Sequence, residues 1–78
     1  MKITIDIENR IINKKDTPCY IPKINNVSIL GEHGYILKNS INDKGEVTDN
    51  IELANTYLQV KIDEINSFMD KNSKFLNN

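Results

Sequence analysis

Residues 49–72 read DNIELANTYLQVKIDEINSFMDKN and contain neither glycine nor proline. Asp49 is followed three residues later by Glu52, which is the spacing of a capping box with Asp49 as the N-cap. Lys71 and Lys74 suit the carboxyl end of a helix, where the helix dipole favours positive charge. The segment therefore predicts one long α-helix over residues 49–72, followed by a tail over residues 73–78.

The apolar residues of this helix fall into two neighbouring stripes when successive side chains are placed about 100° apart. The first stripe is expected to face the core and comprises Ile51, Ala54, Leu58, Ile62, Ile65 and Met69. The second stripe, called the flank below, comprises Leu53, Tyr57, Val60 and Phe68. Together they span about 200° of the helix circumference, whereas a helix resting on one sheet needs little more than about 100°. We therefore expect the flank to be covered by a second copy of the chain, by another protein, or by intrachain packing of residues 13–26 or of Phe75 and Leu76.

The first half of the chain carries strand and turn signals. Isoleucines at positions 3, 5, 7 and 11 alternate with mostly polar residues, which predicts a half-buried strand over residues 2–11. Pro18 and Pro22, with polar clusters on both sides, predict an extended loop over residues 13–26. Two short apolar runs, 27–30 and 35–37, surround Gly31 and Gly34 and predict a β-hairpin. Residues 42–45 predict a further turn, and residues 46–48 either a short fourth strand or the approach to the helix.

These elements predict a single α+β domain over residues 1–78. Residues 1–48 are expected to form a small, mostly antiparallel β-sheet of three to four strands, with connecting loops. One long C-terminal amphipathic α-helix is expected to lie across the face of this sheet.

Composition narrows the classes of partner. The 78 residues carry a net charge of −1, with ten basic and eleven acidic side chains, which argues against a strongly basic nucleic-acid wrapper and against a DNA mimic. The sequence has no run of about eighteen apolar residues of the kind that crosses a membrane. Asp6 places a carboxylate where a secretory signal needs its apolar stretch. The expected location is the cytoplasm, with no membrane partner.

Few residues suggest chemistry. Cys19 is the only cysteine and His33 the only histidine, so we expect no internal disulfide, no metal site and no cofactor. Cys19 activated by His33, or a carboxylate pair such as Asp63 and Asp70, would be the basis of an enzyme hypothesis. A buried thiol and an exposed turn histidine explain the first pair more simply, so the sequence predicts a protein that is not an enzyme.

A mildly basic group of residues supports an alternative function. Arg10, Lys14 and Lys15 lie close together in the sequence and could contact a phosphate backbone, with two-fold symmetry doubling their charge. A solvated face explains them more simply, because Tyr20 is the only aromatic residue near them in the sequence. The alternative hypothesis is a small nucleic-acid-binding regulator.

The favoured hypothesis is a small, non-enzymatic protein–protein interaction module. A chain of this size without disulfide or metal usually needs unusually good packing or an oligomer, which favours a homodimer. The flank residues Leu53, Tyr57, Val60 and Phe68 are the candidate dimer- or partner-binding residues. In size and composition the chain resembles the short accessory proteins of phages and mobile elements, including anti-CRISPR and other anti-defence inhibitors. The resemblance implies an inhibitor that occludes a host protein in the host cytoplasm, and it assigns no site residues.

Overall fold

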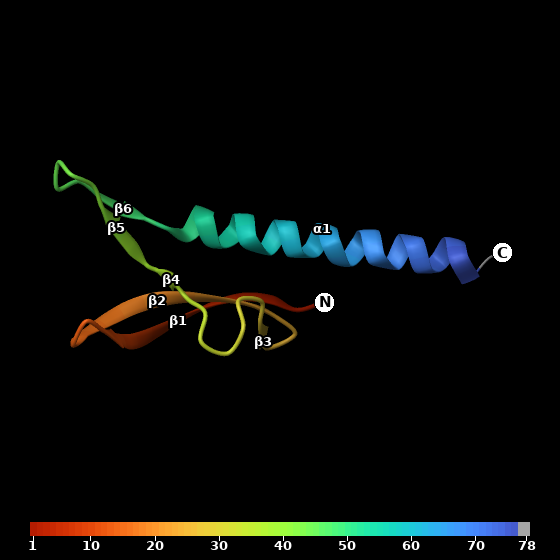
Figure 1. Ribbon diagram of the computed structural model, residues 1–78, viewed down its shortest axis with the longest axis horizontal. Coiled ribbons are helices and arrows are strands. Elements are labelled where there is room, and N and C mark those ends of the chain that lie inside the picture. The colour runs from red at the N-terminus through yellow and green to blue at the C-terminus, as the bar shows by residue number, and fades with distance from the viewer. Residues whose placement is uncertain (77–78) are drawn as a thin grey trace.

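The computed structural model describes the backbone of residues 1–76 and the side chains of residues 1–69. A four-stranded antiparallel sheet, a two-stranded ribbon and one C-terminal helix make up this part of the chain (Figure 1). The elements are β1 (Ile3–Ile12), β2 (Lys15–Ile24), β3 (Val27–Ser28), β4 (Ile36–Leu37), β5 (Asn39–Ile41), β6 (Val47–Asp49) and α1 (Ile51–Leu76). The predicted α+β architecture is confirmed. No described helix is long and apolar enough to cross a membrane.

The core of the sheet is a long hairpin formed by β1 and β2, paired from Ile3 with Ile24 to Ile12 with Lys15. Asn13 and Lys14 connect the strands, and their φ angles of 51° and 65° are positive, as a type I′ hairpin turn requires. The strand predicted over residues 2–11 is therefore confirmed. The extended loop predicted over residues 13–26 is wrong, because residues 15–24 form the central strand of the sheet.

The two prolines fit into this central strand because of the side to which their nitrogens point. The carbonyl of Pro18 accepts a hydrogen bond from the Lys38 N–H at 3.1 Å, and that of Pro22 accepts one from the Ile29 N–H at 3.1 Å. The N and C=O of a strand residue point to the same neighbour, so both proline nitrogens face away from β1. The missing N–H groups therefore cost the β1–β2 ladder no hydrogen bond.

The hairpin predicted between residues 27–30 and 35–37 is wrong in its pairing. β3 and β4 do not pair with each other; each pairs separately with β2. The segment between them instead forms a loop, in which a Cβ on Gly34 would lie only 2.2 Å from the Leu30 carbonyl oxygen. This close approach explains the glycine at position 34.

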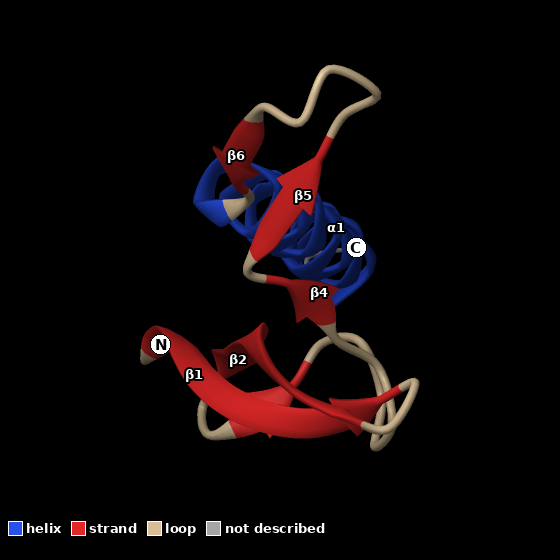
Figure 2. Cartoon of the chain, turned by 90° about the vertical axis from the view of Figure 1, so that its left-hand side faces the viewer, coloured by secondary structure: helices blue, strands red, loops and turns tan. Residues whose placement is uncertain are grey.

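The turn predicted over residues 42–45 is confirmed, and it joins β5 to β6. The Asn42 side-chain oxygen accepts hydrogen bonds from the N–H groups of Lys44 and Glu46, both at 2.9 Å. Gly45 takes a φ of 78°, a value that glycine adopts without strain. Residues 47–49 are thus a strand, but β5 and β6 form a ribbon separate from the main sheet (Figure 2).

The helix begins at a cluster of hydrogen bonds around Asp49. Its carboxylate accepts hydrogen bonds from the Ile51 N–H at 2.9 Å and from the Tyr20 hydroxyl at 2.7 Å, and it binds the Lys38 ammonium at 3.1 Å. Asn50 donates its N–H to the Lys38 carbonyl at 2.8 Å, which is the carbonyl that Pro18 leaves free. Asp49 does accept a hydrogen bond from the first turn, as predicted, but the Ala54 N–H bonds to the Asn50 carbonyl, so Asn50 is the N-cap. The predicted capping box with Asp49 as the N-cap is therefore wrong by one residue. The helix continues to Leu76, beyond the predicted end at residue 72, so the tail predicted over residues 73–78 is wrong for residues 73–76. The side chains of Lys71, Asn72 and Lys74 lie outside the described residues.

The two faces of the sheet are covered by different segments. On one face, Tyr20, Ile36 and Ala54 form a buried cluster, against which Ile5 and Leu30 pack. Figure 1 shows α1 on this side of the hairpin, whereas the loop between β3 and β4 starts on this side with Leu30 and then turns away from α1.

Arg10 ties this loop to the sheet. It donates a hydrogen bond to the His33 carbonyl at 3.3 Å, and its guanidinium carbon lies 5.8 Å from the centre of the Tyr35 ring. Cys19 and Ile21 alternate with Tyr20 along β2, so they face the loop side, where both are buried.

The chain is more open than a compact monomer of its size. Its radius of gyration is 16.3 Å and its extents are 57 × 25 × 18 Å, whereas a compact domain of this length has a radius of gyration of about 11.5 Å. Its solvent-accessible surface is 6190 Å², against about 4,850 Å² expected for a folded monomer of this mass. The excess is about 1,300 Å².

Candidate functional site

The inner stripe of α1 is only partly covered by the sheet. Ala54 and Leu58 are buried, and Ile62 and Ile65 are half-buried. Ile51 and Met69, at the two ends of the stripe, are exposed, so the predicted core face is confirmed in its middle and wrong at its ends. Figure 1 gives the reason: α1 starts above the middle of the β1–β2 hairpin and extends past its open end.

The flank of α1 is exposed along its whole length. The exposed fractions are 47% for Leu53, 47% for Tyr57, 53% for Val60 and 66% for Phe68. Neither segment considered for intrachain cover is shown to cover it. Residues 15–24 belong to the sheet, where Tyr20 packs under Ala54, and the side chains of Phe75 and Leu76 lie outside the described residues. Within the described part of the chain, the flank is therefore an open apolar surface.

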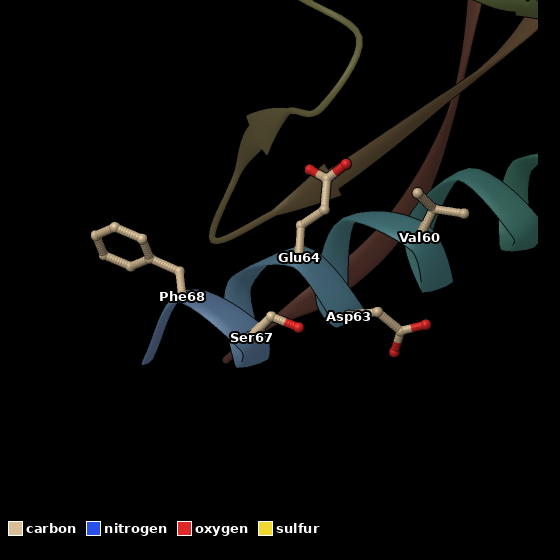
Figure 3. Close-up of a pocket in the computed structure, with 5 residues that line it drawn as sticks. All are labelled: Val60, Asp63, Glu64, Ser67 and Phe68. Atoms are coloured by element: carbon tan, nitrogen blue, oxygen red, sulfur yellow. The ribbon is translucent and has the colours of Figure 1, made fainter. Parts of the chain in front are cut away.

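A groove of about 490 Å³ runs along the carboxyl half of this flank. Val60, Asp63, Glu64, Ser67 and Phe68 line it, and Figure 3 shows Val60, Glu64 and Phe68 along one side, with Asp63 and Ser67 on the other. Four of these residues have the i, i+3, i+4, i+7 spacing of the hole that accepts a side chain from a facing helix in knobs-into-holes packing. Any exposed face of an α-helix has this spacing, so the shallow, open groove permits packing of a facing helix without by itself identifying one.

A second groove, of about 270 Å³, adjoins the first. Ile29 and Leu30 form one wall, and Tyr57, Val60, Lys61 and Glu64 form the other. Val60 and Glu64 line both grooves and therefore stand between them. Lys61 and Glu64 interrupt the apolar stripe but form an ion pair at 3.7 Å, so they add no net charge to the surface.

The basic residues do not form a free cluster. Arg10 forms an ion pair with Glu8 at 3.3 Å and is held by His33 and Tyr35, as described above. Lys14 and Lys15 lie at the turn between β1 and β2 and are exposed. The structure therefore leaves two of the three predicted nucleic-acid contacts, Lys14 and Lys15, without an observed ion pair.

The charged groups around Asp49 have a structural role. The Tyr20 hydroxyl, followed by the Lys38 ammonium, donates hydrogen bonds that lower the pKa of Asp49. The same bonds raise the pKa of Tyr20 and of Lys38, because the negative charge of Asp49 favours their protonated forms. The cluster joins β2, β4 and the start of α1. No signal in the sequence linked Tyr20 to Asp49.

The other candidate chemical residues lie apart from the flank. Cys19 is fully buried in β2, and this burial raises the pKa of its thiol. His33 is exposed in the loop, and only its carbonyl makes a recorded bond. Asp63 accepts a hydrogen bond from Gln59 at 2.9 Å, and the Asp70 side chain lies outside the described residues. The side chains that the structure describes contain no cluster of three potential metal ligands.

A second exposed apolar set was not foreseen. It comprises Ile7 and Ile11 on β1, together with Ile41 on β5 and Val47 on β6. The alternation in β1 indicated inward-facing isoleucines, but α1 does not reach the turn end of the hairpin. The sequence pattern does not indicate which segment would cover these four residues.

The chain was compared with known proteins, and no family model, curated protein or solved structure matches it.

Proposed function

We propose that this protein is a non-enzymatic protein–protein interaction module that binds a protein surface through the flank of α1. The observation that carries the proposal is the exposure of all four flank residues, Leu53, Tyr57, Val60 and Phe68, in a row interrupted only by the Lys61–Glu64 ion pair. Contiguous apolar side chains along one helix face are typical of helices that dock into a complementary groove or onto another helix.

The shape of the chain supports the same proposal. An excess surface of about 1,300 Å² exceeds the share of about 800 Å² that each partner contributes to a standard protein–protein interface. A chain with this much surplus surface gains stability when a partner covers it. The flank is the longest exposed apolar row on the described part of α1.

The inhibitory role is the finer part of the proposal. The module acts by occluding a surface of a host macromolecule. Its resemblance in size and composition to the small accessory proteins of phages and mobile elements implies this role. Occlusion requires only a surface that binds the target, and the exposed apolar flank is such a surface.

Site-specific photocrosslinking tests the proposal. A photoreactive phenylalanine analogue replaces Tyr57 in one variant and Gln59, on the polar side of the same helix, in a control. Irradiation in cell extract should give covalent protein adducts from position 57 and few from position 59. Absence of any adduct from position 57, in a variant that retains its helical circular dichroism, contradicts the proposal.

A further inference from the structure

We infer that the partner on the flank is a second copy of this chain, bound with the two α1 helices antiparallel about a two-fold axis beside Val60 and Lys61. This inference rests on the proposed function, because it names the occupant of the same surface. Three observations carry it: the surface area, the spacing of the groove and the charge at the centre of the flank.

The area fits a homodimer. The surplus of about 1,300 Å² belongs to the whole chain, including the exposed residues of β1, β5 and β6, and its size falls in the range of roughly 1,000–2,500 Å² per partner that obligate dimers bury. The chain also exposes Ile51 and Met69 at the ends of the inner stripe of α1. A second helix alongside α1 would reduce the exposure of these two side chains to water.

The flank is complementary to itself when two copies run antiparallel. Residues at equal distances from the axis face each other, as an isologous contact requires. Leu53 then faces Phe68 of the second copy, which matches two large apolar side chains. Tyr57 faces Glu64 of the second copy and enters the groove that Val60, Glu64 and Phe68 line. The Tyr57 ring fills this groove, and the Tyr57 hydroxyl reaches the Glu64 carboxylate of the second copy at its edge.

The charges at the centre permit this approach. Lys61 and Glu64 form an ion pair within each chain, so the axis lies beside two pairs with no net charge. A parallel arrangement also pairs large apolar side chains, Leu53 with Leu53 and Phe68 with Phe68. It leaves Tyr57 facing another Tyr57 instead of the groove, however, and it places Glu64 opposite another Glu64. Like charges in that position are unfavourable.

The mass in solution is the first test. Light scattering across a range of concentrations should give twice the 9.0 kDa chain mass for the natural protein at micromolar concentration. A monomer at every concentration up to the millimolar range overturns the inference. Tyr57→Asp should raise the dissociation constant at least about 100-fold. In each of the two symmetric contacts it places one new carboxylate beside Glu64 of the opposite copy. Asn55→Asp, an exposed position on the polar side of α1, should leave the constant unchanged.

Disulfide trapping tests the orientation. Leu53→Cys and Phe68→Cys variants are mixed under mild oxidation, and the antiparallel arrangement predicts a 53–68 cross-link between copies. Cys19 does not compete because it is fully buried. Cross-links of Leu53→Cys with itself, in place of the mixed product, overturn the antiparallel geometry.

The crosslinking and mass measurements separate the two proposals. A monomeric protein whose position 57 still crosslinks to other proteins contradicts the homodimer and leaves the interaction module standing. A protein that gives neither self-association nor adducts contradicts both.

Discussion

The same substitution at two leucines of α1 should destabilise the protein at every concentration in one case and only at high concentration in the other. Leu58 is 4% exposed and lies over the sheet, whereas Leu53 lies on the exposed flank one turn earlier. Leu→Ala at either position changes helix propensity by a similar, small amount. Any difference between the two variants therefore reports on what each side chain packs against.

Leu58→Ala should destabilise the chain at every concentration. Removing a buried leucine costs about 2–5 kcal/mol, through lost transfer free energy and the cavity left behind. In a domain of this size each kcal/mol lowers the melting temperature by about 4–8 °C, so the midpoint should fall by about 10 °C or more.

Leu53→Ala should instead be nearly neutral in dilute protein, within about 0.5 kcal/mol, as is usual for surface positions. At high concentration the Leu53→Ala variant should melt at a lower temperature than the natural protein, because the stability gained from dimerisation depends on concentration. Thermal unfolding by circular dichroism at two concentrations provides the measurement. Equal destabilisation by the two variants in dilute protein would refute the assignment of separate inner and outer faces to α1.

Three further outcomes follow from individual contacts. The Tyr20 hydroxyl lowers the pKa of Asp49 below its unfolded value, so the stability from this ionised carboxylate is present above the unfolded pKa and is lost as pH falls through the folded pKa. Asp49→Asn should flatten the acid limb of a urea-unfolding pH profile, and an unchanged limb would contradict this assignment. Gly34→Ala should lower the melting temperature because its Cβ meets the Leu30 carbonyl oxygen, whereas an unaltered midpoint would show that the loop relaxes freely. Cys19 should react with a thiol reagent at neutral pH only as fast as the protein unfolds, since burial raises its pKa, and rapid labelling of folded protein would refute its enclosure.

The elements with local periodicity could be predicted from the sequence. The alternating isoleucines of β1, the Asn42–Gly45 turn and the glycine-free helix each follow from residues that are neighbours in the chain. The open flank was also predictable, because helical spacing alone shows that the apolar arc is too wide for one sheet.

The central strand was not predictable in the same way. Pro18 and Pro22 argue against a central strand unless one knows which neighbour their nitrogens face, and that depends on β3 and β4. A usable signal was present at both ends of the strand. Asn13 and Lys14, and then Asn25 and Asn26, all take positive φ, and asparagine is among the residues that tolerate this conformation. Paired turn residues bracketing residues 15–24 indicate two hairpins joined by one strand.

The incorrect hairpin over residues 27–37 has a similar cause. Two glycines between short apolar runs are the usual hairpin signal, but each run here is only two residues long where it pairs. Such short strands gain more from adding to the edge of β2 than from pairing with each other. The sequence of residues 27–37 alone does not reveal that β2 competes for pairing with β3 and β4.

The attachment of α1 affects how the chain can meet a partner. Among the described residues, every directional bond between the helix region and the sheet lies at Asp49 or Asn50, and the remainder of α1 rests on the sheet through apolar contacts. Apolar contacts have no preferred direction. The hydrogen bonds thus fix only the start of the rod, and the burial of Ala54 and Leu58 holds the next two turns against the sheet. A partner that tilted the rod would have to offset the loss of that burial.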